Sequence, residues 1–107
     1  MSEVLAQLEK KGGGSLIFDV TAAGNNGAEQ YANTTIPPQN LYHKLKIVEY
    51  KNLSYTVSTY PRILIDSTEY QRPTIGTEFD ITNKDVTITA YANTNGWKQT
   101  GVKVELS

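Results

Sequence analysis

The sequence contains no cysteine, and it has only one histidine, one methionine and one tryptophan. Without cysteine the fold cannot depend on a disulfide, and no thiolate is present to bind a metal. Because His43 stands alone, the side chain that most often serves acid–base catalysis and metal binding occurs only once. We therefore expect no cofactor.

The sequence also has no cluster of positive charge and no long apolar run. Its 10 basic and 11 acidic residues are scattered along the chain and leave a net charge of −1. A nucleic-acid-binding protein would need a basic stripe to neutralise phosphates, so we expect no such partner. No segment approaches the roughly 18 apolar residues of a membrane span, and no secretion signal is expected. These features predict a protein that stays in the cytoplasm or leaves it as part of an assembly.

What the sequence does contain is typical of β-structure. Its 107 residues predict a single domain, and its seven tyrosines outnumber the two phenylalanines. Apolar and polar residues alternate in short segments separated by turn residues, which predicts an antiparallel β-sandwich over 15–107 with Greek-key or jelly-roll connections. The same alternation predicts which side chains are buried: Phe18, Val20, Leu45, Ile47, Ile63, Ile65, Phe79, Ile81, Val86, Ile88, Val102 and Val104.

The first residues differ from the rest. Residues 1–11 predict a short amphipathic helix with Val4, Leu5 and Leu8 on one face, and Gly12 to Gly14 end it as a flexible linker. Such a short helix is marginal in water unless it lies on another surface. Its own β-domain and a neighbouring copy are both candidates, and the glycine linker favours a neighbour because three glycines are costly to order in a fixed corner. We therefore expect an interface arm.

The strongest hairpin signal in the chain is Asn95-Gly96. A two-residue turn there would set Ile88 opposite Lys103, which mixes apolar and charged residues on one face of a sheet. The pattern therefore predicts either a β-bulge at Gly101 or a three-residue loop from Asn95 to Trp97, and we favour the bulge because a glycine inside a strand pattern usually has such a reason.

Polar candidates for a catalytic or metal site have ordinary structural explanations. No nucleophile motif accompanies His43, which we expect to be a surface residue. Asp80, Asn83 and Asp85 carry oxygen ligands that calcium prefers, but they lack the glycine and the distal glutamate of a calcium loop. We therefore predict a turn there, no metal site and no enzymatic activity.

The aromatic residues are the better candidates for a binding surface. Such rings could form a surface that stacks on sugars or docks a protein, because they combine a large apolar area with a polar tip. The candidates are Tyr31, Tyr42, Tyr50, Tyr55, Tyr60, Tyr70, Tyr91 and Trp97, and of these we single out Tyr31, Tyr91 and Trp97. The tetrapeptide Tyr-Ala-Asn-Thr begins at both Tyr31 and Tyr91, but the flanking residues differ. We interpret the repeat as a coincidence of composition.

The Thr-, Asn- and Tyr-rich strand of 86–94, the glycine-linked N-terminal helix and the last strand at the C-terminus resemble small β-sandwich proteins of bacteriophage virions. The resemblance implies a non-enzymatic subunit of a capsid, neck or tail, which oligomerises or binds other virion proteins and is assembled in the host cytoplasm. A carbohydrate-binding or receptor-binding module is the alternative. An immunoglobulin-like adhesion domain is a third, and the missing cysteines argue against it.

Overall fold

The computed structural model describes residues 15–22, 30–51, 59–92 and 100–107. These residues contain strands and no helix. The expected helix of 1–11, the linker of 12–14 and Trp97 lie outside them. The described strands are β1 (Leu16–Thr21), β2 (Gln30–Ile36), β3 (Lys44–Lys51), β4 (Arg62–Ile65), β5 (Thr68–Gln71), β6 (Glu78–Asp80), β7 (Val86–Ala92) and β8 (Gly101–Leu106).

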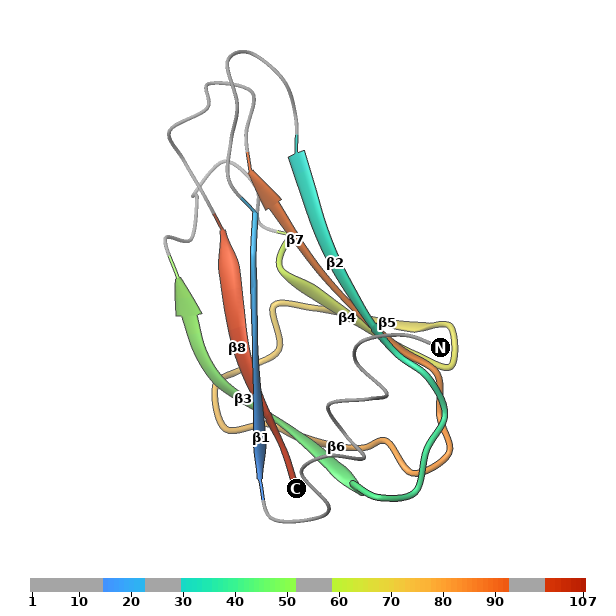
Figure 1. Cartoon of the computed structure of the whole chain (residues 1–107). Coiled ribbons are helices and arrows are strands. Elements are labelled where there is room, and N and C mark those ends of the chain that lie inside the picture. The colour runs from blue at the N-terminus through green and yellow to red at the C-terminus, as the bar shows by residue number, and fades with distance from the viewer. Residues whose placement is uncertain (1–14, 23–29, 52–58, 93–99) are drawn as a thin grey trace.

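The strands form two antiparallel sheets that face each other as a sandwich (Figure 1). The first, here called the β1 sheet, has the order β1-β8-β3-β6, and the second, the β2 sheet, has the order β2-β7-β4-β5. The pairing is nested: β1 pairs with β8, β2 with β7, β3 with β6 and β4 with β5. The chain is therefore arranged as one long hairpin that has been rolled up, which is the jelly-roll connection.

The core lies between the two sheets and follows the alternation in the sequence. Strands β1 and β7 bury every second residue, because successive side chains of a strand point to opposite faces. Of the side chains predicted to be inside, Phe79 is partly buried against the core and the others are buried. The prediction of the sandwich and of its inner faces is thus confirmed. The core further includes Leu16, Ala22, Ile36, Tyr42, Ala90, Ala92 and Leu106.

The apolar run Ile63-Leu64-Ile65 is not buried throughout. Ile63 and Ile65 enter the core, whereas Leu64 lies half-buried on the outer face of β4. The turn after β4 was not predicted: Asp66 and Ser67 both have positive φ, at 47° and 73°, and connect β4 to β5 as a two-residue hairpin. This hairpin forms the tip of the rolled ribbon.

The predicted hairpin at Asn95-Gly96 is wrong. Strands β7 and β8 lie in opposite sheets, so Ile88 and Lys103 are not opposite each other. The predicted bulge at Gly101 is also absent from the described pairing, since Gly101 is in register with both Thr21 and Lys51. The irregularity lies instead in β3, between Ile47 and Glu49. Local turn chemistry could not show that the chain crosses between sheets at this point.

A buried glutamine shapes the connection from β2 to β3, which follows Pro37 and Pro38. The side-chain oxygen of Gln39 accepts hydrogen bonds from the backbone N–H groups of Leu41 and Tyr42, each at 2.8 Å. Its side-chain nitrogen donates to the Tyr42 carbonyl oxygen at 2.8 Å. These bonds satisfy backbone groups that would otherwise be buried without partners, and they hold the Tyr42 ring in the core.

We expect Tyr42→Phe to stabilise the protein by about 1 kcal/mol. The Tyr42 side chain is fully buried, and its hydroxyl finds no hydrogen-bond partner among the described residues. Removing the hydroxyl removes the cost of taking it out of water and keeps the ring packing. Urea denaturation of the two proteins measures the difference. A loss of stability of about 1 kcal/mol would contradict the prediction and would indicate that the hydroxyl is bonded.

Candidate functional site

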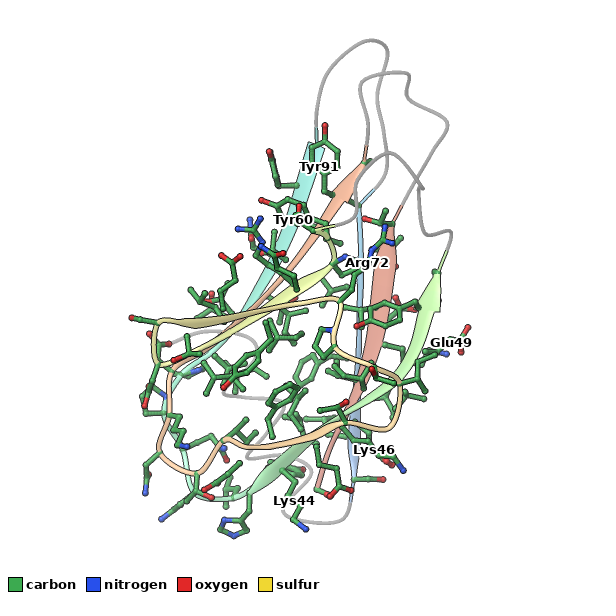
Figure 2. The ribbon with its side chains drawn as sticks, turned by 180° about the vertical axis from the view of Figure 1, so that it is seen from behind. Lys44, Lys46, Glu49, Tyr60, Arg72 and Tyr91 are labelled. Carbon is green, nitrogen blue, oxygen red and sulfur yellow. The ribbon has the colours of Figure 1, made fainter. Side chains whose placement is uncertain are left out.

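The outer face of the β2 sheet carries a cluster of aromatic rings. Tyr31 of β2 and Tyr91 of β7 are direct cross-strand partners, and their ring centroids are 5.1 Å apart in an edge-to-face arrangement. Tyr60, just before β4, stacks on Tyr91 at 5.4 Å and meets Tyr31 edge-on at 5.8 Å. Figure 2 shows Tyr60 and Tyr91 side by side. Each of these rings therefore contacts the other two.

Arg62 adds a positive charge to this cluster. Its guanidinium carbon lies 4.0 Å from the centroid of the Tyr60 ring, which is a cation–π contact. Its Nη1 also forms an ion pair with Glu69 of β5 at 3.1 Å. The ring and the carboxylate together fix the plane of the guanidinium. We call Tyr31, Tyr60, Tyr91 and Arg62 the tyrosine patch.

The sequence predicted part of this patch. Tyr31 and Tyr91 were proposed together, and the structure places them in contact; Trp97, the third proposed residue, lies outside the described residues. Tyr60 was one of the wider set of aromatic candidates, whereas the contribution of Arg62 was missed. The signal was present, because Tyr60, Arg62 and Leu64 alternate with buried Pro61, Ile63 and Ile65. However, only the pairing of β4 with β7 brings that row beside Tyr91. Tyr42, another member of the wider set, is buried in the core and cannot belong to a binding surface.

The patch leaves little open ring surface. The Tyr60 ring is in contact with Arg62 and stacked with Tyr91, and Tyr91 also meets Tyr31. Tyr31 is the most open of them, with 53% of its surface exposed. A flat platform for sugar rings needs free ring faces, whereas a packed cluster with hydroxyl tips and a guanidinium is typical of protein interfaces.

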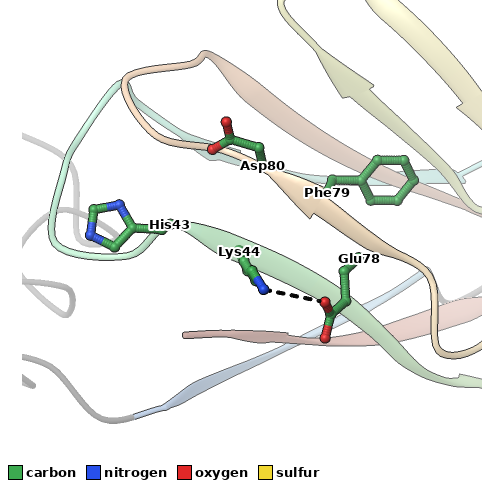
Figure 3. A pocket seen from close by; sticks show the side chains of 5 residues that line it. All are labelled: His43, Lys44, Glu78, Phe79 and Asp80. Carbon is green, nitrogen blue, oxygen red and sulfur yellow. Dashed lines mark ion pairs between the residues drawn. The ribbon is translucent and has the colours of Figure 1, made fainter.

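A pocket of about 440 Å³ lies at the β3–β6 side of the sandwich (Figure 3). His43, Lys44, Glu78, Phe79 and Asp80 line it, and Lys44 Nζ lies 3.6 Å from a carboxylate oxygen of Glu78. Both of these charged side chains are about half exposed or more, at 61% and 49%, so their attraction is weak.

His43 is exposed, as predicted, and it contacts a hydroxyl next to a carboxylate. Its Nδ1 is 2.9 Å from Thr82 Oγ1. The Thr82 backbone N–H donates to Asp80 at 3.0 Å, and this bond first, then that of the Thr82 hydroxyl, lowers the pKa of Asp80. In a catalytic triad the imidazole lies between the hydroxyl and the carboxylate. Here Thr82, and not His43, contacts the Asp80 carboxylate, so the three groups do not have the order of a triad.

The other polar candidates have structural roles. Asn83 lies in a turn with a φ of 56°, a conformation that asparagine tolerates. The Asp85 backbone N–H donates to the Asp66 carboxylate at 2.8 Å, and the Asp66 N–H donates back to the Asp85 carbonyl oxygen. These bonds tie the turn before β7 to the β4–β5 hairpin. Within the described ranges, no three acidic or histidine side chains gather closely enough to hold a metal ion.

The outer face of the β1 sheet is charged, with both signs interleaved. Lys51 of β3 pairs with Asp19 of β1, and Lys103 of β8 lies 3.7 Å from Glu49. Figure 2 shows Lys44, Lys46 and Glu49 spaced along β3. Charges of opposite sign on this face neutralise one another and are well solvated. The two outer faces of the sandwich therefore differ in chemistry: the face of the β1 sheet is charged, whereas the face of the β2 sheet is uncharged over β2 and β7.

The Asp19–Lys51 pair makes a prediction about pH. The hydrogen bond from Lys51, and then that from Thr21, lowers the pKa of Asp19 below its ordinary value of 3.8. The stabilisation is therefore complete above that value and is lost as the pH falls through the lowered pKa of the folded state. Since 33% and 39% of the two side chains are exposed, we expect Lys51→Met to cost only about 0.5 kcal/mol at pH 7. Denaturation at pH 7 and pH 2 should show this difference shrinking, and a difference that does not depend on pH would contradict the prediction.

Comparison with known protein families, with curated proteins and with solved structures finds no match to this chain. In the described part of the chain, no helix has the length and hydrophobicity needed to cross a membrane.

Proposed function

We propose that this protein is a non-enzymatic structural subunit that assembles with copies of itself or with other proteins, as a component of a bacteriophage capsid, neck or tail does. The jelly-roll connection supports the proposal, because viral capsid domains use this fold repeatedly. Lectin domains and cupins use it as well, so the fold alone does not decide the function. A virion location follows from the same proposal.

The observation that carries the proposal is the tyrosine patch. Tyrosine and arginine are the residue types that dominate binding energy at protein interfaces, while lysine and glutamate are depleted there. Along β2 the patch continues into Asn33 and Thr35, which are exposed and uncharged. An uncharged surface with a packed aromatic and arginine centre suits a neighbouring subunit.

A lack of enzymatic activity is part of the same proposal. In the described part of the chain, a histidine, a hydroxyl and a carboxylate come together with Thr82, not His43, against the carboxylate, which is not the order of a catalytic triad. The polar groups around them close a turn and a hairpin. These roles support a structural protein.

The alternative is a carbohydrate-binding or receptor-binding module, and the half-exposed Tyr31 ring is the observation that favours it. Stacking of a sugar on this ring would require one open face. Nuclear magnetic resonance titration with a panel of oligosaccharides tests this alternative through the Tyr31 ring signals. Saturable shifts would favour the alternative over assembly.

We expect Tyr31→Ala to weaken self-association by about tenfold, because a half-exposed tyrosine at an interface contributes roughly 1–2 kcal/mol. Light scattering coupled to size-exclusion chromatography over a range of concentrations measures the effect. Tyr70→Ala is the matched control, since Tyr70 is a partly exposed tyrosine of the same sheet that packs on Phe79 outside the patch. A full-length protein that remains monomeric throughout would contradict the proposed function.

A further inference from the structure

Strand β2 differs from the other strands at the edges of the two sheets. Among the described strands, β1, β6, β2 and β5 each have a hydrogen-bonded neighbour on one side only. An edge strand offers unpaired N–H and C=O groups to another chain, and proteins protect such edges with short strands, charges or proline. The four edges can therefore be compared by length and charge.

Three of these edges are protected. Strand β6 has three residues, two of which are Glu78 and Asp80, and β5 has four residues with Glu69 among them. Strand β1 has six residues and carries Asp19 in its ion pair with Lys51. Strand β2, in contrast, has seven residues and no charge, and Pro37 and Pro38 come only after its end.

From this contrast we infer that β2 is the docking edge for a second copy of the chain, whose own β2 pairs with it in antiparallel orientation and extends the β2 sheet across the dimer. The inference rests on the proposed self-association and names its surface. A two-fold axis sets a strand against itself, so a charge at the centre of that strand faces its own like charge. Among the described edges, β2 is the one that carries no charged residue and is thus free of such repulsion in any register.

The register follows from the alternation of faces. Antiparallel pairing centred on Asn33 places Asn33 opposite its own mate and Tyr31 opposite Thr35 of the other copy. The side chains of Tyr31, Asn33 and Thr35 lie on the outer face of the sheet and are exposed. In this register they pair with one another across the dimer, while Ala32 pairs with Thr34 on the inner face. Seven paired residues span roughly 23 Å at about 3.3 Å per residue.

This pairing also uses the tyrosine patch. A single strand pair covers less area than the roughly 800 Å² per partner of a stable interface. Tyr31 belongs to β2 and stands at the margin of the patch, so pairing at the edge brings its exposed ring against the outer face of the partner's strand. The aromatic surface and the strand edge therefore form one continuous interface.

The test compares Asn33→Lys with Thr89→Lys in the full-length chain. Asn33 and Thr89 are cross-strand partners, and the hydrogen bond of 2.7 Å that joins their side chains is lost in either variant. Both variants add one positive charge to the same outer face. Only Asn33→Lys adds it at the edge, where it faces its own mate in the dimer, whereas Thr89 lies on the central strand β7.

We expect analytical ultracentrifugation to show a dimer whose dissociation constant rises about tenfold in Asn33→Lys and changes little in Thr89→Lys. A dimer that is insensitive to Asn33→Lys, or one that both variants weaken equally, would overturn the inference and leave the proposed self-association standing. A wild-type chain that is monomeric at every concentration would overturn both.

Hydrogen exchange of the wild-type chain provides a second measurement that does not depend on the variants. Backbone amides of 30–36 should exchange more slowly at concentrations where the dimer forms than in the dilute monomer, while those of β5, at the other edge of the same sheet, should not change. Equal exchange of 30–36 at both concentrations would overturn the inference even if a variant failed to fold.

Discussion

Gly101→Ala should destabilise the protein by about 1–3 kcal/mol. Gly101 opens the central strand β8 and is buried beside Thr21 of β1. A Cβ at Gly101 would lie 2.5 Å from Thr21 Oγ1 and 3.2 Å from Thr21 Cα, so β1 would have to move. Replacing glycine by alanine also restricts the unfolded chain, which stabilises by only about 0.4–1 kcal/mol. The steric cost is larger, and urea denaturation should show a net loss.

A double-mutant cycle with Thr21→Ala separates the cause. Thr21→Ala removes the oxygen that the new methyl group would meet, together with the hydrogen bond of 2.7 Å that Thr21 donates to Asp19. We expect the double variant to be more stable than the sum of the single effects predicts. Strict additivity would show that contact with the threonine hydroxyl is not the reason for glycine at this position.

Leu5→Asp together with Leu8→Asp should weaken assembly while leaving the β-domain folded. The sequence predicts that these residues and Val4 form the apolar face of an arm, and burying three such side chains contributes roughly 4–8 kcal/mol. Two aspartates on that face would remove most of this contribution. Light scattering reports the loss of assembly, and circular dichroism reports the retained β-structure.

The matched control is Glu3→Gln with Gln7→Glu, which exchanges polar groups away from the apolar face and keeps the net charge. This control should assemble like the wild type. If the aspartate variant instead unfolds the whole domain as a monomer, the arm belongs to its own core and the assembly interpretation loses the support of the arm. The β2 edge is tested separately.

The inner faces of the sandwich could be predicted because burial in a sheet repeats every two residues. Val86, Ile88 and Ala90 face the core as their alternation with threonine and tyrosine indicates. In Ile63-Leu64-Ile65 an apolar residue on the outer face hides the period, yet Ile63 and Ile65 are buried as predicted. The β4–β5 hairpin was not predicted from the sequence, because Asp66-Ser67 is a weaker turn signal than Asn-Gly.

Strand pairing could not be predicted, because it depends on contacts far apart in the sequence. Asn95-Gly96 suggested a β7–β8 hairpin, yet β8 pairs with β1 and β3 in the other sheet. The choice between the two arrangements is made by the whole core: nested pairing covers the apolar inner faces of both sheets with each other. The turn preference of two residues contributes far less free energy than the burial of two apolar sheet faces.

The candidate site likewise combines residues that the sequence indicated with residues that only the strand pairing brings together. Tyr31 and Tyr91 were singled out from composition alone, and their contact follows from the pairing of β2 with β7. Tyr60 and Arg62 joined them only because β4 lies on the other side of β7. The contact of His43 with Thr82, 39 residues away, likewise depends on the return of the chain beside the β2–β3 connection.

The sequence by itself determined the all-β class and most residues of the core, since both depend on the local alternation of apolar and polar side chains. The absence of cysteine likewise excluded disulfides and thiolate metal sites, because no other side chain supplies a thiol. Only the tertiary structure decided which strands lie at the edges and which side chains share an outer face. Those properties arise from the nested pairing of strands that lie far apart in the chain. Strand β2 lies at an edge because, among the described strands, it pairs with β7 alone.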